Sequence, residues 1–328
     1  MTSSTKQGRT MDWKTVAWSV TLLAGLTNIT LAQSVSDVTG AGWIVEGLDS
    51  EKTGSKPESA GLPESAVVTQ RGNSSATLFS WSGEKKSTDL SGPLVTDRPD
   101  FTEASSTVGH GVFQIEIGYT YTCDNDGTTQ TVSHSYPETL LRYGMLANWL
   151  EFRLGSNFLS ERIGGLASTG SEDLYLGFKM GLTPQHDWLP ETALIPQMTV
   201  PTGSGFLTNN KVLPGANLVY SWDITERLST AGSTQFNSAL DDATNSQYAE
   251  WAQSWTFGYA LTDQLGMYTE WYAFFPNGAD SITEEHYFNG GFTRTVGHNV
   301  QWDIRGGMGL NEAADDYFLG TGLSVRFR

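Results

Sequence analysis

The sequence is poor in cysteine, in basic residues and in long apolar runs, and each shortage excludes a class of protein. A single cysteine, Cys123, leaves no intrachain disulfide framework and no cysteine-rich zinc site. The formal net charge of −17 argues against nucleic-acid binding, which needs a basic surface. Beyond the N-terminal region no apolar run reaches the roughly 18 residues of a membrane-spanning helix, so a helical membrane protein is excluded.

Glycine and aromatic residues are abundant instead. The 328 residues include 36 Gly, 11 Trp, 12 Tyr and 15 Phe, and 38% of all residues are hydrophobic. That hydrophobic fraction argues against wholesale disorder. The composition therefore favours a large β protein with few lysines.

Residues 1–32 have the features of a secretory signal peptide. A basic start that includes Lys14 precedes an apolar run of about a dozen residues, and small residues stand at Thr30 and Ala32. Cleavage after Ala32 would leave Gln33 as the first residue of an exported protein. A single membrane anchor is the alternative, but the apolar run is short for a membrane span.

Residues 33–92 are polar and rich in Ser, Gly, Thr and Glu, without a sustained hydrophobic period. Such a composition predicts a disordered extension or linker, and a small module is the alternative. The remaining residues, 93–328, are expected to form the main domain, because regular periodicity begins only there.

Alternation of apolar and polar residues is the main structural signal of this domain. Phe113, Ile115 and Ile117 alternate with Gln114 and Glu116, which is the period of a strand with one apolar face. Eight segments show the pattern clearly and four more weakly. They are residues 113–122, 150–158, 173–182, 194–200, 216–222, 254–261, 300–308 and 317–327, and then 138–145, 228–238, 265–274 and 285–296.

The connections between these segments alternate in length. Those at 146–149, 223–227, 262–264 and 297–299 are short, whereas those at 123–135, 159–171, 202–213, 239–247, 275–284 and 310–316 are mostly longer, polar and often acidic. Tight turns at one end and long loops at the other are typical of outer-membrane barrels, and a sandwich or jelly roll does not segregate its loops in this way. An even strand count places both termini in the periplasm and the long loops outside.

The two faces of the predicted strands favour lipid over water as the surroundings. The polar face carries Gly, Ser, Thr, Asn and isolated charges, where a soluble sandwich would carry many Lys and Glu. Several apolar faces have an aromatic residue near one end, as the girdles of membrane barrels require. We therefore predict an all-β fold, an antiparallel up-and-down transmembrane β-barrel of about 12 strands in the cell outer membrane.

The alternation assigns a set of charged residues to the polar face, which would line the pore. The pore-lining set is Glu116, Glu138, Arg142, Glu151, Arg153, Asp173, Lys179, Asp303 and Arg305, and Gln197, Glu270, Gln301 and Arg326 fall on the same face. Both signs of charge occur, so ion pairs are expected to cross the lumen. A barrel of this size encloses a narrow pore that is easily blocked.

Five segments carry a resemblance to a known family. They are Thr96–Glu103 (TDRPDFTE), Phe113–Tyr119 (FQIEIGY), Glu138–Gly144 (ETLLRYG), Asp173–Lys179 (DLYLGFK) and Thr199–Gly203 (TVPTG). In this order they are similar to the family of outer-membrane transporters named for the meta-pathway of phenol degradation. The resemblance extends over about residues 94–328 and implies a barrel that transports small molecules. It supplies no catalytic residues, and the extension at 33–92 and the terminal Arg328 depart from the family pattern.

The charged run just before the first strand is a candidate periplasmic clasp or plug. Asp97, Arg98, Asp100 and Glu103 are expected to close the periplasmic mouth or to fold into the lumen, with lumen arginines as partners. The alternative is a charged turn that only caps the edge of the barrel.

Enzymatic signatures are missing from the sequence. Its five histidines are scattered, and it contains no nucleophile elbow, no zinc-protease motif and no phosphate-binding loop. The acidic clusters, and His286 beside Glu284 and Glu285, are expected to be solvated loops and not metal sites.

We therefore predict a non-enzymatic channel for the passive passage of small solutes, hydrophobic or aromatic compounds among them, with no cofactor and no metal. The expected partners are outer-membrane lipids, a small-molecule solute and the barrel-assembly machinery, and not nucleic acid. A structural or adhesive barrel, a soluble secreted β protein and a lipid-directed barrel hydrolase are the alternatives.

Overall fold

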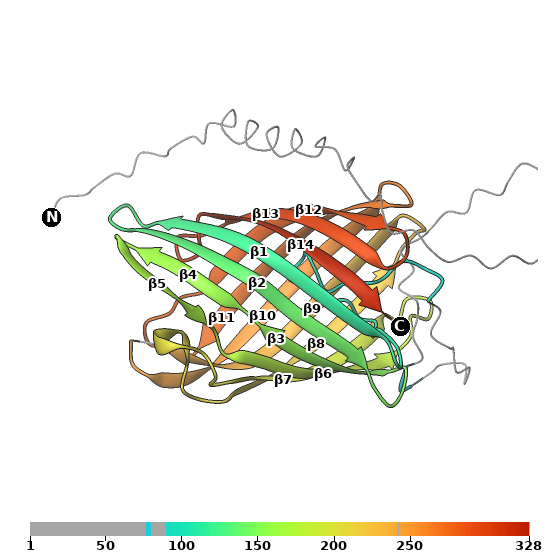
Figure 1. Cartoon of the computed structure of the whole chain (residues 1–328), viewed down its shortest axis with the longest axis horizontal. Coiled ribbons are helices and arrows are strands. Elements are labelled where there is room, and N and C mark those ends of the chain that lie inside the picture. Colours follow the sequence, from blue (N-terminus) through green and yellow to red (C-terminus); the bar gives the residue numbers. More distant parts are fainter. Residues whose placement is uncertain (1–76, 80–89, 242, 328) are drawn as a thin grey trace, which may run out of the picture. The chain divides into compact units, whose positions relative to one another are not determined.

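The computed structural model describes residues 77–79, 90–241 and 243–327, which include one closed antiparallel β-sheet (Figure 1). The predicted signal peptide at 1–32 lies outside the described residues, as does most of the predicted extension at 33–92. In the described part of the chain, no helix has the length and apolar character needed to span a membrane.

The sheet contains fourteen strand segments, which make twelve strands. β3 and β4 both pair with β2 and are one strand interrupted at Asn157, and β5 and β6 are one strand interrupted at residues 172–173. The bounds are β1 Phe113–Asn125, β2 Gln130–Gly144, β3 Leu150–Ser156, β4 Phe158–Ile163, β5 Leu166–Ser171, β6 Leu174–Thr183, β7 Glu191–Val200, β8 Leu213–Asp223, β9 Leu228–Asp241, β10 Ser246–Ala260, β11 Leu265–Asn277, β12 Glu285–Val296, β13 Val300–Gly309 and β14 Tyr317–Phe327, with a 3₁₀ turn η2 at Gly205–Leu207.

The first and last strands pair and close the sheet. β1 runs antiparallel to β14 from the pair Phe113–Phe327 to the pair Cys123–Tyr317, and every other strand pairs with its neighbour in the chain. Closure pairs the strands on both sides around the barrel wall, as strands need in hydrocarbon, and of the described strands only the short β5 at the opposite end from the β14 terminus pairs on one side, with β4. The predicted up-and-down barrel of about twelve strands is confirmed.

The barrel is polar inside and apolar outside. Glu116 and Arg142 are fully buried on the inner face, whereas the side chains of Ile117 and Leu323 on the outer face are 42% and 44% exposed. A soluble protein buries the opposite set, so this polarity fits an exterior in contact with lipid. The aromatic residues predicted near strand ends include several on this exposed surface, namely Tyr143, Phe158, Phe236, Phe292, Trp302 and Phe327.

The two ends of the barrel differ in their connections. The end at which β14 finishes, here called the terminal end, has turns at residues 145–149, 184–190, 224–227, 261–264 and 297–299. The opposite end, here called the mouth end, lies at the left in Figure 1 and carries loops 201–212, 278–284 and 310–316. The chain therefore returns to the terminal end after every second strand.

Three connections at the mouth end are shorter than the sequence predicts. The predicted loops at 123–135, 159–171 and 239–247 are mostly paired strand, with turns at 126–129, 164–165 and 243–245. Backbone pairing continues there, for example between Asp124 and Thr131, although side chains on both faces are polar. Strand and loop cannot be distinguished by hydrophobic period where both faces of a strand meet water.

The outer face predicts the effect of a charge placed in it. Leu323 lies in the middle of β14, between Ile117 of β1 and Trp302 of β13. Leu323→Arg should destabilise the barrel in lipid vesicles by roughly 2–4 kcal/mol, because a guanidinium at mid-membrane depth loses its hydration. Urea titration followed by heat-modifiable gel migration measures this.

Leu146→Arg is the matched control, since Leu146 lies in a turn at the terminal end and is 80% exposed. This variant should unfold at the urea concentration of the unmodified protein. Equal destabilisation by the two substitutions would contradict the assignment of a lipid-facing surface.

Candidate functional site

A segment of the chain itself occupies the lumen. Residues 90–112, here called the plug segment, begin at the terminal end, where Leu94 N donates a hydrogen bond of 2.8 Å to His298 O. They return to the same end before β1, where Gly111 N donates to Gly144 O at 2.8 Å. Between these points the segment contacts inner-face residues of most of the barrel strands, so it forms a re-entrant loop (Figure 1).

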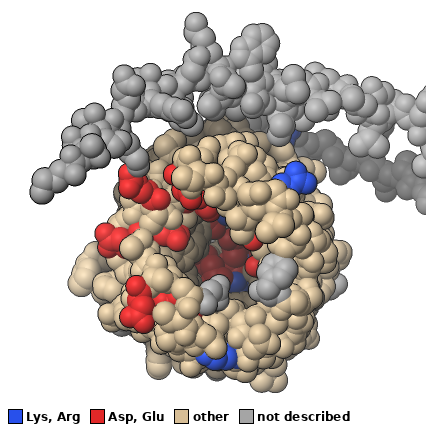
Figure 2. All heavy atoms as spheres, turned by 90° about the vertical axis from the view of Figure 1, so that its left-hand side faces the viewer, with Lys and Arg blue, Asp and Glu red and all other residues tan. Residues whose placement is uncertain are grey.

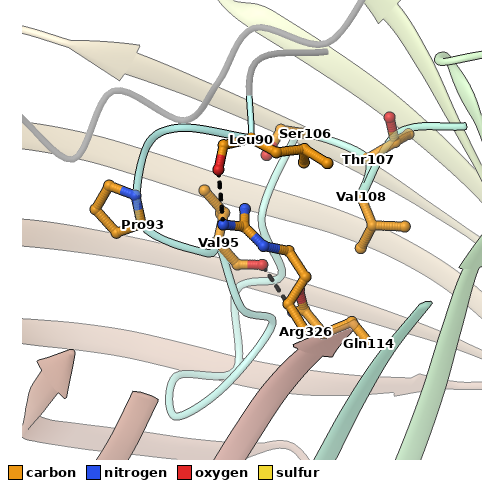
Figure 3. Close-up of a pocket in the computed structure, with 8 residues that line it drawn as sticks. All are labelled: Leu90, Pro93, Val95, Ser106, Thr107, Val108, Gln114 and Arg326. Atoms are coloured by element: carbon orange, nitrogen blue, oxygen red, sulfur yellow. Dashed lines mark hydrogen bonds between the residues drawn. The ribbon is translucent and has the colours of Figure 1, made fainter. Parts of the chain in front are cut away.

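The two limbs of the plug segment pack together where they enter the barrel (Figure 3). Arg326 donates hydrogen bonds to Leu90 O at 3.3 Å and to Gly92 O at 2.9 Å, and Gln114 donates to Val95 O at 2.9 Å. The cavity between the limbs has a volume of about 20 Å³, room for about one water molecule. Its lining consists of Leu90, Pro93, Val95, Ser106, Thr107, Val108, Gln114 and Arg326.

Asp97 is the centre of the contacts between the plug segment and the barrel wall. Its carboxylate is 2.7 Å from Lys179 Nζ and 3.3 Å from Arg142 Nη1, and it also forms an ion pair with Arg153. All four side chains are almost completely buried. One carboxylate from the plug therefore faces three cations, which come from β2, β3 and β6.

The other hydrogen-bond donors of Arg142 and Arg153 pair with carboxylates of the barrel wall and of the plug segment. Glu151 accepts from Arg142 at 2.7 Å and from Arg153 at 3.2 Å. Arg153 also pairs with Glu103 of the plug segment. Glu116 pairs with Arg142 at 3.0 Å and accepts the backbone N–H groups of residues 97 and 98.

Arg98 projects toward a different part of the wall. Its guanidinium donates to Glu138 at 2.8 Å and lies 3.4 Å from Asp303. Two glycines paired across the β1–β14 junction, Gly118 and Gly322, leave the space that it fills. A Cβ added at Gly118 would lie 2.1 Å from Arg98 Nη1, and one at Gly322 would lie 2.3 Å from Arg98 Nε.

The apex of the plug segment is held through its backbone. Glu270 of β11 accepts hydrogen bonds of 2.7 Å from Phe101 N and from Thr102 N, and a third from the Thr102 hydroxyl. Asn289 of β12 donates to the same carboxylate at 2.8 Å. The apex is thus fixed on the side of the barrel opposite to Asp97.

The other residues assigned from the sequence lie as follows. Arg305 donates to Pro99 O at 2.9 Å, and Asp100 belongs to the same turn of the plug. Asp173 lies at the break between β5 and β6, where it accepts from Gly203 N and Asn209 N at 2.9 Å each. It therefore fastens loop 201–212 at the mouth end and takes no part in the contacts around Asp97.

Eight of the nine charged residues assigned to the polar face thus gather around the plug segment, together with Asp97, Arg98 and Glu103. The segment lies inside the lumen, which is the first of the two arrangements considered for it. Sequence reasoning did not identify the roles of Gly118, Gly322 and Phe101. The position of the two glycines on the polar face of their strands was a usable signal, whereas nothing in the sequence indicates what Phe101 contacts.

At the mouth end the lumen is open and acidic. Figure 2 shows the hollow from this side, with acidic side chains on its rim and within it. In loop 310–316, partial burial raises the pKa of Asp315 from its usual 3.8 to about 6, and the nearby carboxylates of Glu285, Asp124 and Asp316 act in the same direction. Across the described residues, no group of three or more His, Cys, Asp or Glu is arranged to hold a metal ion.

Comparison with known families gives one match. The model of the family described as "Putative MetA-pathway of phenol degradation" matches residues 96–327, which confirms the resemblance seen in the sequence motifs. A comparison with curated proteins gives no match.

Solved structures share the fold at low sequence identity. An outer membrane channel from Pseudomonas putida F1 is 14% identical with a TM-score of 0.59, and the match covers 70% of this chain and 99% of that one. The NanC porin is 10% identical with a TM-score of 0.42, covering 65% and 98% of the two chains. The CymD monoaromatic hydrocarbon channel is 12% identical with a TM-score of 0.36, covering 66% and 83%. The last two scores are too low to support an argument.

The glycine pair predicts a way to loosen the plug without unfolding the barrel. In Gly118→Ala the new methyl group takes the place of the Arg98 guanidinium, which must move because it is the flexible end of a side chain. The amide hydrogens of residues 97 and 98 should then exchange about tenfold faster or more, since hydrogen bonds to charged groups contribute roughly 1.5–3 kcal/mol each. Hydrogen–deuterium exchange by mass spectrometry measures this.

Gly181→Ala provides the control, because the nearest atom to its added Cβ lies 3.7 Å away. Exchange in the plug segment should not change in this variant. If Gly118→Ala also leaves the exchange of the plug unchanged, the position described for the Arg98 guanidinium between Gly118 and Gly322 is wrong.

The raised pKa of Asp315 predicts a dependence of stability on pH. The folded protein binds this proton more tightly than the unfolded chain, so the protonated loop is favoured below about pH 6 and its advantage is lost as the pH rises through 6. Asp315→Asn should therefore raise the thermal unfolding temperature relative to the unmodified protein at pH 8 and have a smaller effect at pH 5. An equal effect at both pH values would show that this carboxyl titrates normally.

Proposed function

The chain belongs to the family described as "Putative MetA-pathway of phenol degradation", and we propose that it acts in the outer membrane as a channel for passive passage of small solutes. The observation that carries the proposal is the plug segment, which fills the terminal end of the lumen and is held there by Asp97 and Arg98. Passage then requires this segment to move aside.

The nature of the contacts supports a plug that moves. The segment is held by ion pairs and hydrogen bonds, and the ring of Phe101 adds an aromatic contact with the wall. A buried ion pair contributes little net free energy, because the Coulomb attraction is largely offset by the loss of hydration. When the plug leaves and water enters, both sets of charges are hydrated again. The closed and open states are therefore expected to differ by only a few kcal/mol.

The acidic mouth end supports a preference among solutes. Carboxylates around a narrow entrance raise the local concentration of cations and lower that of anions. Loops 278–284 and 310–316 contribute such groups, Asp280 and Asp315 among them. Neutral and cationic solutes are thus favoured over anionic ones, and the family description adds hydrophobic or aromatic compounds as candidates.

The proposal extends to the parts of the chain that precede the plug. Residues 1–32 act as a signal peptide, residues 33–92 form a polar extension, and the barrel-assembly machinery inserts residues 93–328 into the outer membrane. In barrels with an even number of strands both termini face the periplasm, so the terminal end is the periplasmic one and the mouth end faces outward. The chain has no enzymatic role in this proposal.

The test is the conductance of single channels in planar lipid bilayers. Asp97→Asn leaves Lys179, Arg142 and Arg153 facing one another without the plug carboxylate, and removing one partner of a buried ion pair costs roughly 3–5 kcal/mol. The plug should leave the lumen for a large part of the time, and the mean ionic current should rise severalfold. Arg98→Ala should act in the same direction through the second anchor.

Asp263→Asn serves as the control, since Asp263 lies in an exposed turn at the terminal end. Its current should equal that of the unmodified protein. The proposal fails if Asp97→Asn and Arg98→Ala both show the conductance of the unmodified protein and the same uptake of solutes into loaded liposomes.

A further inference from the structure

One side chain of the plug differs in kind from its polar neighbours. The ring of Phe101, at the apex, lies parallel to the ring of Tyr272, with centroids 4.6 Å apart and an interplanar angle of 6°. The same ring meets the edge of Phe274 at 5.4 Å and 90°. Behind Tyr272 the stack continues to Tyr287, at 4.8 Å and 14°. The plug thus inserts one aromatic ring into an aromatic site on the wall.

The wall supplies everything at this site except Phe101. Tyr272 and Phe274 come from β11, Tyr287 comes from β12, and Phe318 of β14 packs against Tyr287 at 6.4 Å. Tyr287 and Phe318 are buried, whereas Phe101 and Tyr272 are half-buried beside the open part of the lumen. When the plug moves aside, the face of Tyr272 that Phe101 covers is exposed to the lumen. Here this face is called the ring site.

Three buried polar atoms on the inner face of β11, β12 and β13 have no hydrogen-bond partner among the residues that the structure describes. They are Tyr268 Oη, Asn289 Oδ1 and Arg305 Nε. Asn289 lies two residues from Tyr287 on β12. Tyr268 lies four residues from Tyr272 on β11, and Arg305 of β13 pairs with Gly291, so these two lie on the same inner face about 13 Å further along the strands. Unsatisfied buried polar atoms are rare and costly in native proteins, at roughly 1–3 kcal/mol each, so a group that pairs with them is expected.

The surroundings also restrict the charge of that group. Glu270 accepts from the backbone of the apex directly beside Phe101, and the acidic mouth lies along the approach. A carboxylate or sulfonate on the ligand would be repelled by these groups. A hydroxyl group on a neutral ligand can donate to Asn289 Oδ1, which is the unpartnered atom two residues from Tyr287.

We propose that the ring site binds the planar ring of a neutral, hydroxyl-bearing aromatic solute, and that Phe101 occupies the site while the channel is closed. This inference rests on the proposed channel function and names the class of its solute. Solute and Phe101 compete for Tyr272, so the solute stabilises the open state by its affinity for that state alone. The aromatic contact gives flat rings an advantage of about 0.5–1.5 kcal/mol beyond their buried area.

The test compares two probes of similar size that both carry a hydroxyl group, p-cresol and 4-methylcyclohexanol, of which only the first is flat. Isothermal titration with the full chain in lipid nanodiscs measures their affinities. Phe101→Ala should bind p-cresol at least tenfold more tightly than the unmodified protein, because the competing ring is gone. It should bind 4-methylcyclohexanol more weakly than p-cresol by a factor of about three to ten, as the aromatic contact predicts.

Substitutions of Tyr272 locate the binding. In the Phe101→Ala background, Tyr272→Leu should abolish the gain in p-cresol affinity, whereas Tyr272→Phe should keep it because the ring remains. Phe101→Leu, which retains an apolar side chain at the apex, should give an intermediate affinity. Equal binding of the two probes by Phe101→Ala, or full p-cresol binding after Tyr272→Leu, overturns the proposal.

Conductance recorded on the same variants separates this inference from the proposed function. If the variants conduct ions but bind both probes equally, the ring-site proposal is wrong and the channel proposal stands. If the variants bind p-cresol as expected but never conduct ions, the channel proposal is wrong and the ring-site proposal stands.

Discussion

A charge inside a closed barrel needs a partner of opposite sign, and this requirement organises the structure. Closing twelve strands pairs the first strand with the last but turns the polar faces of all strands toward a narrow common space. Arg142, Arg153 and Lys179 project into that space from neighbouring strands and are completely buried there. Asp97 of the plug segment supplies the carboxylate that they share, and this contact is one of those that hold the segment inside the lumen.

Two kinds of contact therefore hold the plug, and they have different consequences. The contacts of Asp97 and Arg98 are electrostatic, reversible and indifferent to the shape of a solute. The stacking of Phe101 on Tyr272 depends on a flat ring and is open to competition by another flat ring. In the channel that we propose, the first kind determines how readily the lumen opens, and the second determines which solute gains from the opening. Under this proposal a single segment of about twenty residues combines closure with recognition.

Much of this arrangement was predictable because it depends on a period of two. The alternation of Phe113, Gln114, Ile115 and Glu116 gave the strand, its lipid face and its lumen face together, and repetition along the chain gave the barrel. The mouth-end hairpins were missed because polar residues on both faces of a strand, as near Asp124, erase the period while the backbone remains paired. The partners of Phe101 and Glu270 were beyond prediction, because contacts across a lumen depend on how deeply a loop enters and not on any spacing in the sequence.

The Arg98 guanidinium occupies a space that the first and last strands form together, since Gly118 and Gly322 are paired where β1 meets β14. This position does not exist until β1 and β14 have paired, because each strand contributes one of its two glycines. The Arg98 guanidinium can therefore take up its observed position only after β1 and β14 have paired. The partners of Asp97 come from β2, β3 and β6 and do not depend on this junction, so the position of Arg98 is the part of the plug's binding site that sheet closure completes.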